Sequence, residues 1–184
     1  TGTGSIDIAA GRDFALAAQT SVVYTAGRPG PAVAEFTARD LVLPAADRYA
    51  PAFPVDGGDL RLAAAGSVIG APSNQLFSQW LYRQGRLRAD GSFDPSFRTG
   101  WWPRYRDFQQ GLGTLGGGDL SVTAGGNILN LNAATVSNGR VGGAVPSLVL
   151  QGGGDLTVRA GGDIGSGVFF VDRGTARLEA AGSI

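Results

Sequence analysis

Five segments of eleven residues align without gaps along the chain and constrain its fold more than any other feature. They are Gly4–Phe14, Gly58–Val68, Gly118–Ile128, Gly154–Ile164 and Gly174–Ile184. In every copy an aliphatic residue or alanine stands at the third, fifth and seventh positions, and the residues between are mostly polar. A period of two with one apolar face is typical of a half-buried β-strand. The repeat therefore predicts five short strands that bury the same face.

A corner and one more apolar residue complete each copy. The eleventh position is always apolar, and a glycine stands one to three residues before it; these glycines are Gly11, Gly66, Gly126, Gly162 and Gly182. A sharp bend between strands needs a positive φ or a close backbone approach, and glycine allows both. Because one copy cannot bury its apolar edge alone, the copies are expected to stack as a parallel β-solenoid.

The spacing of the copies leaves part of the architecture open. They begin 54, 60, 36 and 20 residues apart. Twenty residues suit one coil, whereas 36 fit either two short coils or one coil with an insertion. The structural alternative is a β-sandwich of hairpins, which predicts two-residue turns between strands. Turn-forming pairs occur at Asp56-Gly57, Asp90-Gly91 and Asn138-Gly139, all outside the repeat. Neither end carries a polar cap, so residues 1–184 are interpreted as one segment of a longer repeat protein.

Two long segments interrupt the repeat. Pro29–Pro54 holds five of the nine prolines and is predicted to be an excursion across the surface, because proline cannot donate to a strand ladder. Ala71–Gly116 holds nine of the 16 aromatic residues and six arginines. We expect this aromatic segment to be mostly irregular and packed on the solenoid. Two short helices are predicted in it, one capped by Ser73 and one starting at Pro103.

The aromatic segment contains the candidate binding residues. They are Trp80, Tyr82, Arg83, Trp101, Trp102, Arg104, Tyr105 and Arg106. Exposed aromatic faces stack on sugars, arginine binds carboxylate or sulfate bidentately, and Trp, Tyr and Arg dominate protein interfaces. The alternative is a small core, made by Phe77, Trp80, Trp101, Trp102 and Phe108, that fastens the segment to the solenoid. Both interpretations hold together if the arginine edge stays exposed.

The run TGWWPRYRDFQQGLGTLGGGDLSVTAGGNI (Thr99–Ile128) and the Gly-Asp-Leu repeats around it resemble the filamentous haemagglutinin family. These are very large two-partner-secretion exoproteins of Gram-negative bacteria, and the WWPRY insertion is similar to a C-terminal region in a subset of them. The resemblance implies a right-handed parallel β-helix at the outer-membrane surface, exported by an outer-membrane transporter. Such a filament shaft or adhesin is expected to bind a glycan or protein on a host or neighbouring cell. Related exoproteins also serve as stalks that deliver a toxin on contact.

Composition excludes several classes of chemistry. All 15 basic residues are arginine, and lysine, histidine, cysteine and methionine are absent. The chain therefore has no Schiff-base lysine, thiol nucleophile, histidine base, disulfide or Cys/His metal site. Its net charge is zero, so no nucleic-acid partner is expected. No apolar run approaches the roughly 18 residues that span a bilayer, so no membrane span is expected either. Neither a cofactor nor a metal is predicted.

Carboxylates are the remaining candidates for chemistry. Asp59, Asp119 and Asp155 recur at the start of the repeat, where an aspartate bonded to its own backbone two residues on would form a turn. A Ca²⁺ ladder is the alternative, because stacked coils would bring the carboxylates together. A polysaccharide-active β-helix could use Asp172-Arg173, or Asp163 near Arg159. No carboxylate has a locatable partner for glycoside hydrolysis, so we predict that the chain is not an enzyme.

Overall fold

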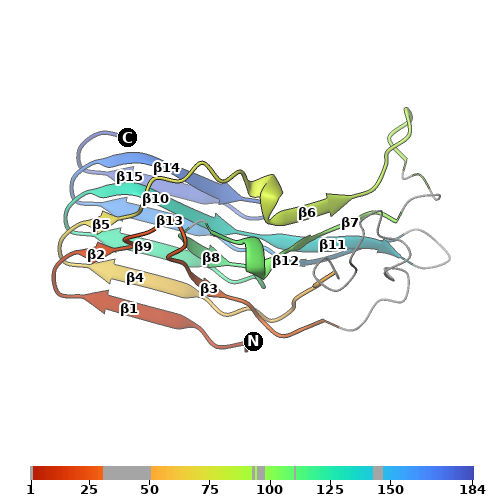
Figure 1. The fold of residues 1–184 in the computed structure, drawn as a ribbon, viewed down its shortest axis with the longest axis horizontal. Coiled ribbons are helices and arrows are strands. Elements are labelled where there is room, and N and C mark those ends of the chain that lie inside the picture. Colours follow the sequence, from red (N-terminus) through yellow and green to blue (C-terminus); the bar gives the residue numbers. More distant parts are fainter. Residues whose placement is uncertain (1, 31–50, 93, 95–97, 110, 143–146) are drawn as a thin grey trace.

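The five copies form one parallel sheet in the computed structural model, which describes residues 2–30, 51–92, 94, 98–109, 111–142 and 147–184 (Figure 1). The strands, in spatial order, are β1 (Ile6–Ala10), β4 (Leu60–Ala64), β9 (Leu120–Ala124), β13 (Leu156–Ala160) and β15 (Ala176–Ala180). Each pair keeps the register of the sequence alignment, residue for residue. The hairpin alternative is therefore wrong for the repeats.

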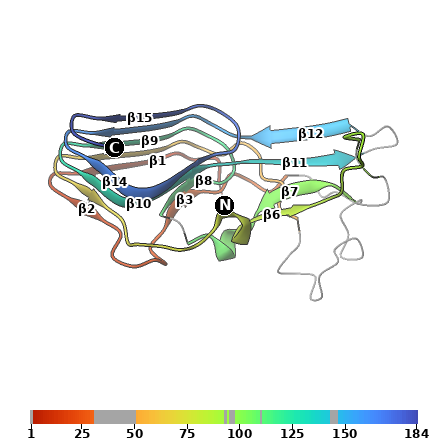
Figure 2. The same ribbon diagram turned by 90° about the horizontal axis from the view of Figure 1, so that it is seen from above.

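A second sheet runs opposite the first. It contains β2 (Phe14–Ala15), β3 (Val23–Thr25), β5 (Val68–Ile69), β8 (Leu112–Thr114), β10 (Ile128–Thr135) and β14 (Ile164–Val171), all paired in parallel. The apolar residue that follows each corner begins a strand of this sheet in the first four copies. Figure 2 shows the two sheets joined by the corners at one end. We call one strand of the first sheet, its corner and the following strand of the second sheet a rung.

The aliphatic side chains of the two sheets fill the space between them. Leu120, Val122, Leu156 and Val158 are no more than 1% exposed, and the residues of the second sheet that pack on them include Ile128 and Ile164. Burying one such side chain stabilises the fold by about 1.5–3 kcal/mol. The apolar positions of the repeat are thus buried together, as predicted, and form one continuous aliphatic core.

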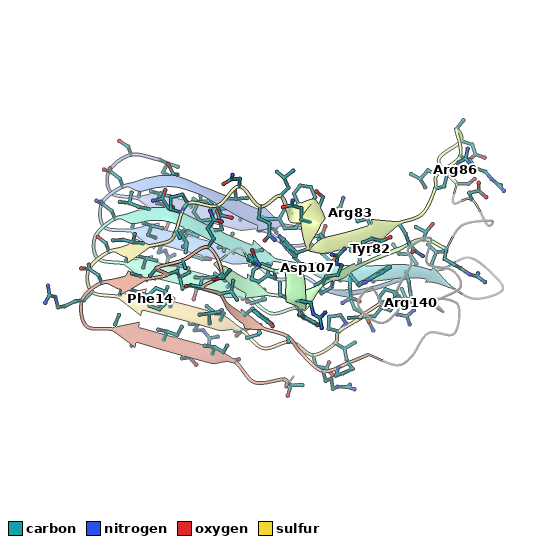
Figure 3. All side chains as sticks on the ribbon, in the orientation of Figure 1. Phe14, Tyr82, Arg83, Arg86, Asp107 and Arg140 are labelled. Carbon is teal, nitrogen blue, oxygen red and sulfur yellow. The ribbon has the colours of Figure 1, made fainter. Side chains whose placement is uncertain are left out.

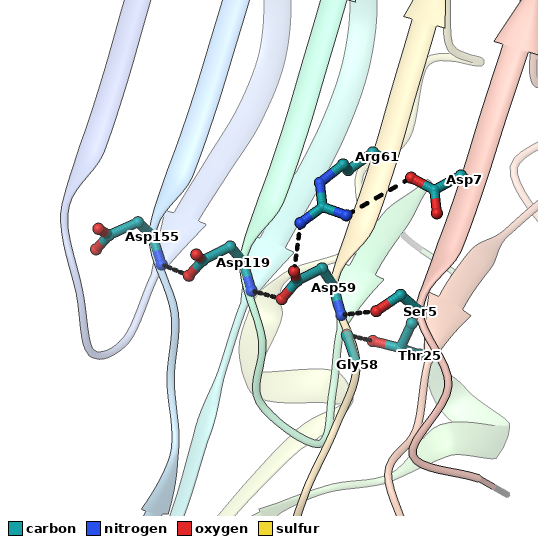
Figure 4. Close-up of polar contacts among 8 residues, drawn as sticks. All are labelled: Ser5, Asp7, Thr25, Gly58, Asp59, Arg61, Asp119 and Asp155. Atoms are coloured by element: carbon teal, nitrogen blue, oxygen red, sulfur yellow. Dashed lines mark hydrogen bonds and ion pairs between the residues drawn. The ribbon is translucent and has the colours of Figure 1, made fainter.

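Hydrogen bonds from side chains to backbone connect each rung to the next (Figure 4). At the second repeat position, the Asp119 N–H donates to Asp59 Oδ1 at 3.0 Å, and the Asp155 N–H donates to Asp119 Oδ1 at 2.9 Å. Ser5 and Thr175 continue this ladder at its two ends. The predicted turn, with each aspartate bonded to its own backbone, is therefore wrong. Strands about 4.8 Å apart bring the N–H of the next rung within reach of the carboxylate.

A second ladder runs along the corners. One residue shortly after each corner glycine takes part. Each side chain accepts a hydrogen bond from the backbone N–H of the next residue in the series Asp13, Ser67, Asn127, Asp163 and Ser183. The glycines leave space for these acceptors: a Cβ on Gly126 would lie 2.6 Å from Ser67 Oγ, and one on Gly162 would lie 2.1 Å from Asn127 Oδ1. Close approach of the neighbouring rung, rather than positive φ, is the reason for glycine at these two corners.

The 36-residue spacing contains one rung with an insertion. The insertion is an antiparallel pair, β11 (Ser137–Gly142) and β12 (Ser147–Gly152), placed between β10 and β13. The next rung, from β13 to β15, has no insertion and shows the bare 20-residue period. For the Pro29–Pro54 excursion, residues 31–50 lie outside the described part of the chain. Its two ends pair through an antiparallel bridge between Arg28 and Val55.

The aromatic segment leaves the second sheet after β5 and returns at β8. Its exit and return, Gly70 and Gly111, both lie against the backbone of β10. The segment contains η3 (Phe77–Gln79), β6 (Leu81–Gln84), β7 (Gly100–Pro103) and η4 (Tyr105–Asp107). β6 and β7 pair in antiparallel fashion, and β7 also pairs with β11, giving a four-stranded sheet that extends beyond the rungs (Figures 1 and 2). The two predicted helices are only single 3₁₀ turns, and Pro103 ends a strand.

Candidate functional site

Two of the candidate binding residues are core residues. Trp80 has no exposed surface and packs edge-on against Phe108, with ring centroids 5.0 Å apart. Trp102 is likewise fully buried, between Phe53 at 5.7 Å and Tyr82 at 4.8 Å. A ring with no exposed surface cannot stack on a ligand. For Trp80 and Trp102 the small-core interpretation therefore replaces the binding one.

Two further candidates hold η4 in place. Arg104 Nε donates to Asp107 Oδ2 at 2.6 Å, and its guanidinium carbon lies 5.7 Å from the centre of the Tyr82 ring. The Tyr105 hydroxyl donates to the carbonyl of Ala26 at 2.9 Å. Burial raises the pKa of Tyr105, with a smaller contribution from Tyr24, so the phenol keeps the proton that it donates. These side chains position the segment on the rungs.

Arg106 also lies in η4. Its side chain is exposed, and the described part of the chain places no carboxylate within ion-pair distance of it. It is therefore separate from the bonded pair formed by Arg104 and Asp107.

Of the three remaining candidates, Tyr82 is half-buried against Trp102. The other two, Arg83 and Trp101, meet in a cleft with a volume of about 300 Å³. We call it the hairpin cleft; its lining is Arg83, Gln84, Gly100, Trp101 and Asp172. Arg83 and Trp101 are direct partners across β6 and β7, so both side chains project from the same face. Asp172 directly follows β14. Figure 3 shows Arg83 and Tyr82 on the extended hairpin.

A chain of hydrogen bonds fixes the floor of the hairpin cleft. Trp101 Nε1–H donates to Ser137 Oγ at 3.1 Å, and the Ser137 hydroxyl donates to Asp172 Oδ2 at 2.5 Å. On the other carboxylate oxygen, Oδ1, Arg83 Nη2 approaches to 3.8 Å. The Asp172 side chain is 18% exposed, whereas that of Arg83 is 54% exposed. The carboxylate is thus held in place while the guanidinium stays accessible.

The Trp101 ring is positioned by a glycine on the neighbouring strand. A Cβ on Gly139 would lie 2.5 Å from the ring, so only glycine at this position lets the indole lie against β11. Beside the cleft, Phe77 stacks on Phe170 with ring centroids 5.0 Å apart, and the Arg83 guanidinium covers Phe77 at 5.4 Å. The cleft therefore has a half-buried indole and both signs of charge, and a partly exposed phenyl ring lies beside it.

This arrangement is suited to binding. An aromatic ring supplies apolar contact, Asp172 accepts hydrogen bonds and Arg83 donates them. Within the described ranges, no three His, Cys, Asp or Glu side chains gather closely enough to hold a metal ion. The chemistry that the cleft offers is recognition of a polar ligand with an apolar face.

Three residues of this site were outside the predicted binding set. From the sequence, Asp172 is a candidate only for a catalytic carboxylate, and neither Ser137 nor Gly139 is a candidate for binding. The repeat does contain a signal for Asp172. Val171 pairs with Thr135 of the preceding rung, so Asp172 comes just after the last paired residue. At the same point in the preceding rung, the hairpin insertion begins with Ser137. Aligning the two rungs would place Asp172 beside the start of that insertion, and so beside Ser137.

None of the helices in the described residues combines the length and apolar character that crossing a membrane requires.

Comparison with known proteins adds no family assignment. Searches with models of protein families, among curated proteins and among solved structures found no match to the chain.

Proposed function

We propose that the chain is a structural and adhesive segment of a large secreted bacterial surface protein, in which a right-handed parallel β-helical shaft carries an attachment cleft. The observation that supports the shaft is the unbroken parallel register of the five repeat strands. The right hand follows from the strong preference of parallel crossovers. In this proposal the protein is not an enzyme.

The ladders support a shaft because each rung bonds to the next in the same way. In both ladders each acceptor side chain bonds to the backbone N–H of the rung that follows it. In such an array stability is approximately a sum over rungs and their nearest-neighbour contacts. The shaft can therefore be lengthened without redesign.

Lengthening the shaft is the direct test of this part of the proposal. Duplicating residues 155–174 after Gly174 adds one bare rung, and the new Asp155 both donates to and accepts from its ladder neighbours. We expect a folded protein with more strand signal by circular dichroism and a melting temperature that does not fall. Loss of folding on duplication would contradict a shaft of equivalent rungs. Duplication of the same length within residues 31–50 controls for added chain length.

The attachment part of the proposal concerns the hairpin cleft. The four-stranded sheet extends beyond the rungs (Figure 1), and two of its strands carry Arg83 and Trp101 in the lining of the cleft. Tryptophan and arginine are among the residues that dominate binding energy at interfaces. The proposed partner is a glycan or protein on a host or neighbouring cell. The proposed location is the bacterial outer-membrane surface, reached through an outer-membrane transporter. The same shaft would also serve as the stalk of a contact-dependent toxin.

Attachment is tested by counting cells that adhere to beads coated with the protein. Arg83→Ala with Trp101→Ala should lower the affinity for the cell surface about tenfold or more, since each removes a contact worth about 1 kcal/mol or more. Arg61→Ala is the matched control, because Arg61 is an exposed arginine on the rungs. Equal adhesion by the two variants, or no adhesion by the unaltered protein, would contradict the proposal. A melting temperature measured for each variant separates lost binding from lost folding.

A further inference from the structure

Side-chain amides gather around a second groove. The sequence has twelve Asn and Gln residues, and seven of them line two adjoining cavities that share Gln19, Ser73 and Gln109. We call this the amide groove; its amides are Gln19, Asn74, Gln75, Gln79, Gln109, Asn130 and Asn132. The larger cavity, with a volume of about 460 Å³, is lined by five of these amides. Asn130 and Asn132 line only the smaller one, whose volume is about 10 Å³. So strong a concentration of one kind of polar group indicates a site for a ligand that amides recognise.

The groove is built from four stretches of chain that are distant in sequence. Gln19 follows β2, Asn74 lies near the start of the aromatic segment, Gln109 follows η4, and Asn132 lies in β10. The aromatic segment leaves at Gly70 and returns at Gly111, so its two ends lie side by side against β10. That topology places Asn74 and Gln109 on the same groove.

Hydrogen bonds hold the lining in place. Gln75 Nε2 donates to the carbonyl of Asp107 at 2.6 Å, and Gln75 Oε1 accepts from the Gln109 N–H at 2.9 Å. Gln19 Nε2 donates to the Pro72 carbonyl at 2.7 Å, and Gln79 Oε1 accepts from the Leu76 N–H at 3.0 Å. The Gln19 and Gln79 amides thus each use one atom for the fold and present the other, so the groove is organised before a ligand arrives.

The side chains of Asn74 and Gln109 are exposed, and within the described residues neither makes a hydrogen bond to the protein. Each amide offers both a donor and an acceptor. These two side chains are therefore the ones that a ligand can engage without breaking the fold.

The charge and polarity of the groove define the class of ligand. Its two charged lining residues, Arg104 and Asp107, are bonded to each other, so no net charge selects an anion or a cation. No aromatic or aliphatic side chain of the described residues lines the larger cavity, which leaves no pocket for the apolar side chains of a peptide. Hydroxyl groups match amides because both donate and accept. We propose that the amide groove binds a neutral saccharide, independently of the hairpin cleft.

The proposal is tested with an array of neutral, sulfated and uronate-containing oligosaccharides, followed by calorimetric titration with the neutral oligosaccharide that binds best. Asn74→Ala combined with Gln109→Ala should weaken binding about tenfold, as expected for the loss of two hydrogen bonds. Thr123→Ala is the control, because Thr123 is an exposed polar residue of β9 that lines neither the amide groove nor the hairpin cleft, and it should leave affinity unchanged. Circular dichroism should show both variants folded.

Four results would overturn the assignment. Three of them are no binding of any neutral oligosaccharide, a preference for sulfated or uronate oligosaccharides, and equal affinity of the double variant and the unaltered protein. If Arg83→Ala abolished saccharide binding, the saccharide would have to bind in the hairpin cleft, and its assignment to the amide groove would be overturned as well. Because the two sites share no lining residue, failure of the amide groove leaves the cell-attachment experiment to be decided separately.

Discussion

Val122→Asp is expected to prevent the chain from folding. Val122 is completely buried at the centre of the middle strand, with Leu62 and Val158 beside it on the neighbouring rungs. A carboxylate there would lose its hydration with no cation to compensate it, a penalty of more than about 4 kcal/mol. That is a large fraction of the 5–15 kcal/mol by which a typical domain is stable. Circular dichroism should show loss of the strand signal and of a cooperative melting transition.

Thr123→Asp is the matched control, because Thr123 is the next residue of β9 and its side chain faces solvent. Its expected effect on the free energy of unfolding is within about 0.5 kcal/mol. Similar destabilisation by both substitutions would mean that β9 tolerates no aspartate on either face. The conclusion that only the face of β9 carrying Val122 is buried would then be refuted.

Gly154→Ala is expected to destabilise the fold by about 3 kcal/mol, or about 6–12 °C in melting temperature. Gly154 is the first residue of its repeat, and a Cβ there would lie 2.0 Å from the carbonyl oxygen of Gly118 on the preceding rung. The backbone fixes the position of the Cβ and the oxygen is itself a backbone atom, so neither a rotamer change nor a small side-chain shift relieves the clash. Urea denaturation followed by circular dichroism measures the change.

Gly4→Ala provides the comparison at the same repeat position. A Cβ on Gly4 would meet no atom within 4 Å, because Gly4 belongs to the first rung. We expect a change within about 0.5 kcal/mol. If Gly4→Ala were as damaging as Gly154→Ala, the cause would be the backbone conformation of the first repeat position and not the approach of stacked rungs.

The repeat made the strands and the core predictable from sequence. Leu120 and Val122 stand two residues apart and share a face, as period two requires, and each copy repeats the pattern at the same positions. Identical patterns pair in identical register because a slip of one residue would turn the apolar side chains outward. The right-handed β-helix stays a proposal, since it depends on how the two sheets connect rather than on the strands themselves.

Local signals were less informative where long-range contacts compete with them. Asn138-Gly139 has the composition of a tight turn, yet it lies inside β11, where Gly139 makes room for Trp101. Pro103 is suited to start a helix, yet it ends β7 opposite Leu81. In both places pairing with a distant strand outweighs the preference of the short peptide.

By itself, then, the sequence determined the rungs: which residues form strands, which face is buried and where the corners lie, because these depend on neighbours two residues apart and on a repeated pattern. Only the tertiary structure decided what lies beside the rungs. Arg83, Trp101 and Asp172 meet in one cleft, and Asn74 meets Gln109 in another, because hairpins and segment ends that are remote in sequence pack at the same edge of the sheets. No local sequence pattern encodes these long-range contacts, because they depend on where each insertion leaves and rejoins the stacked rungs.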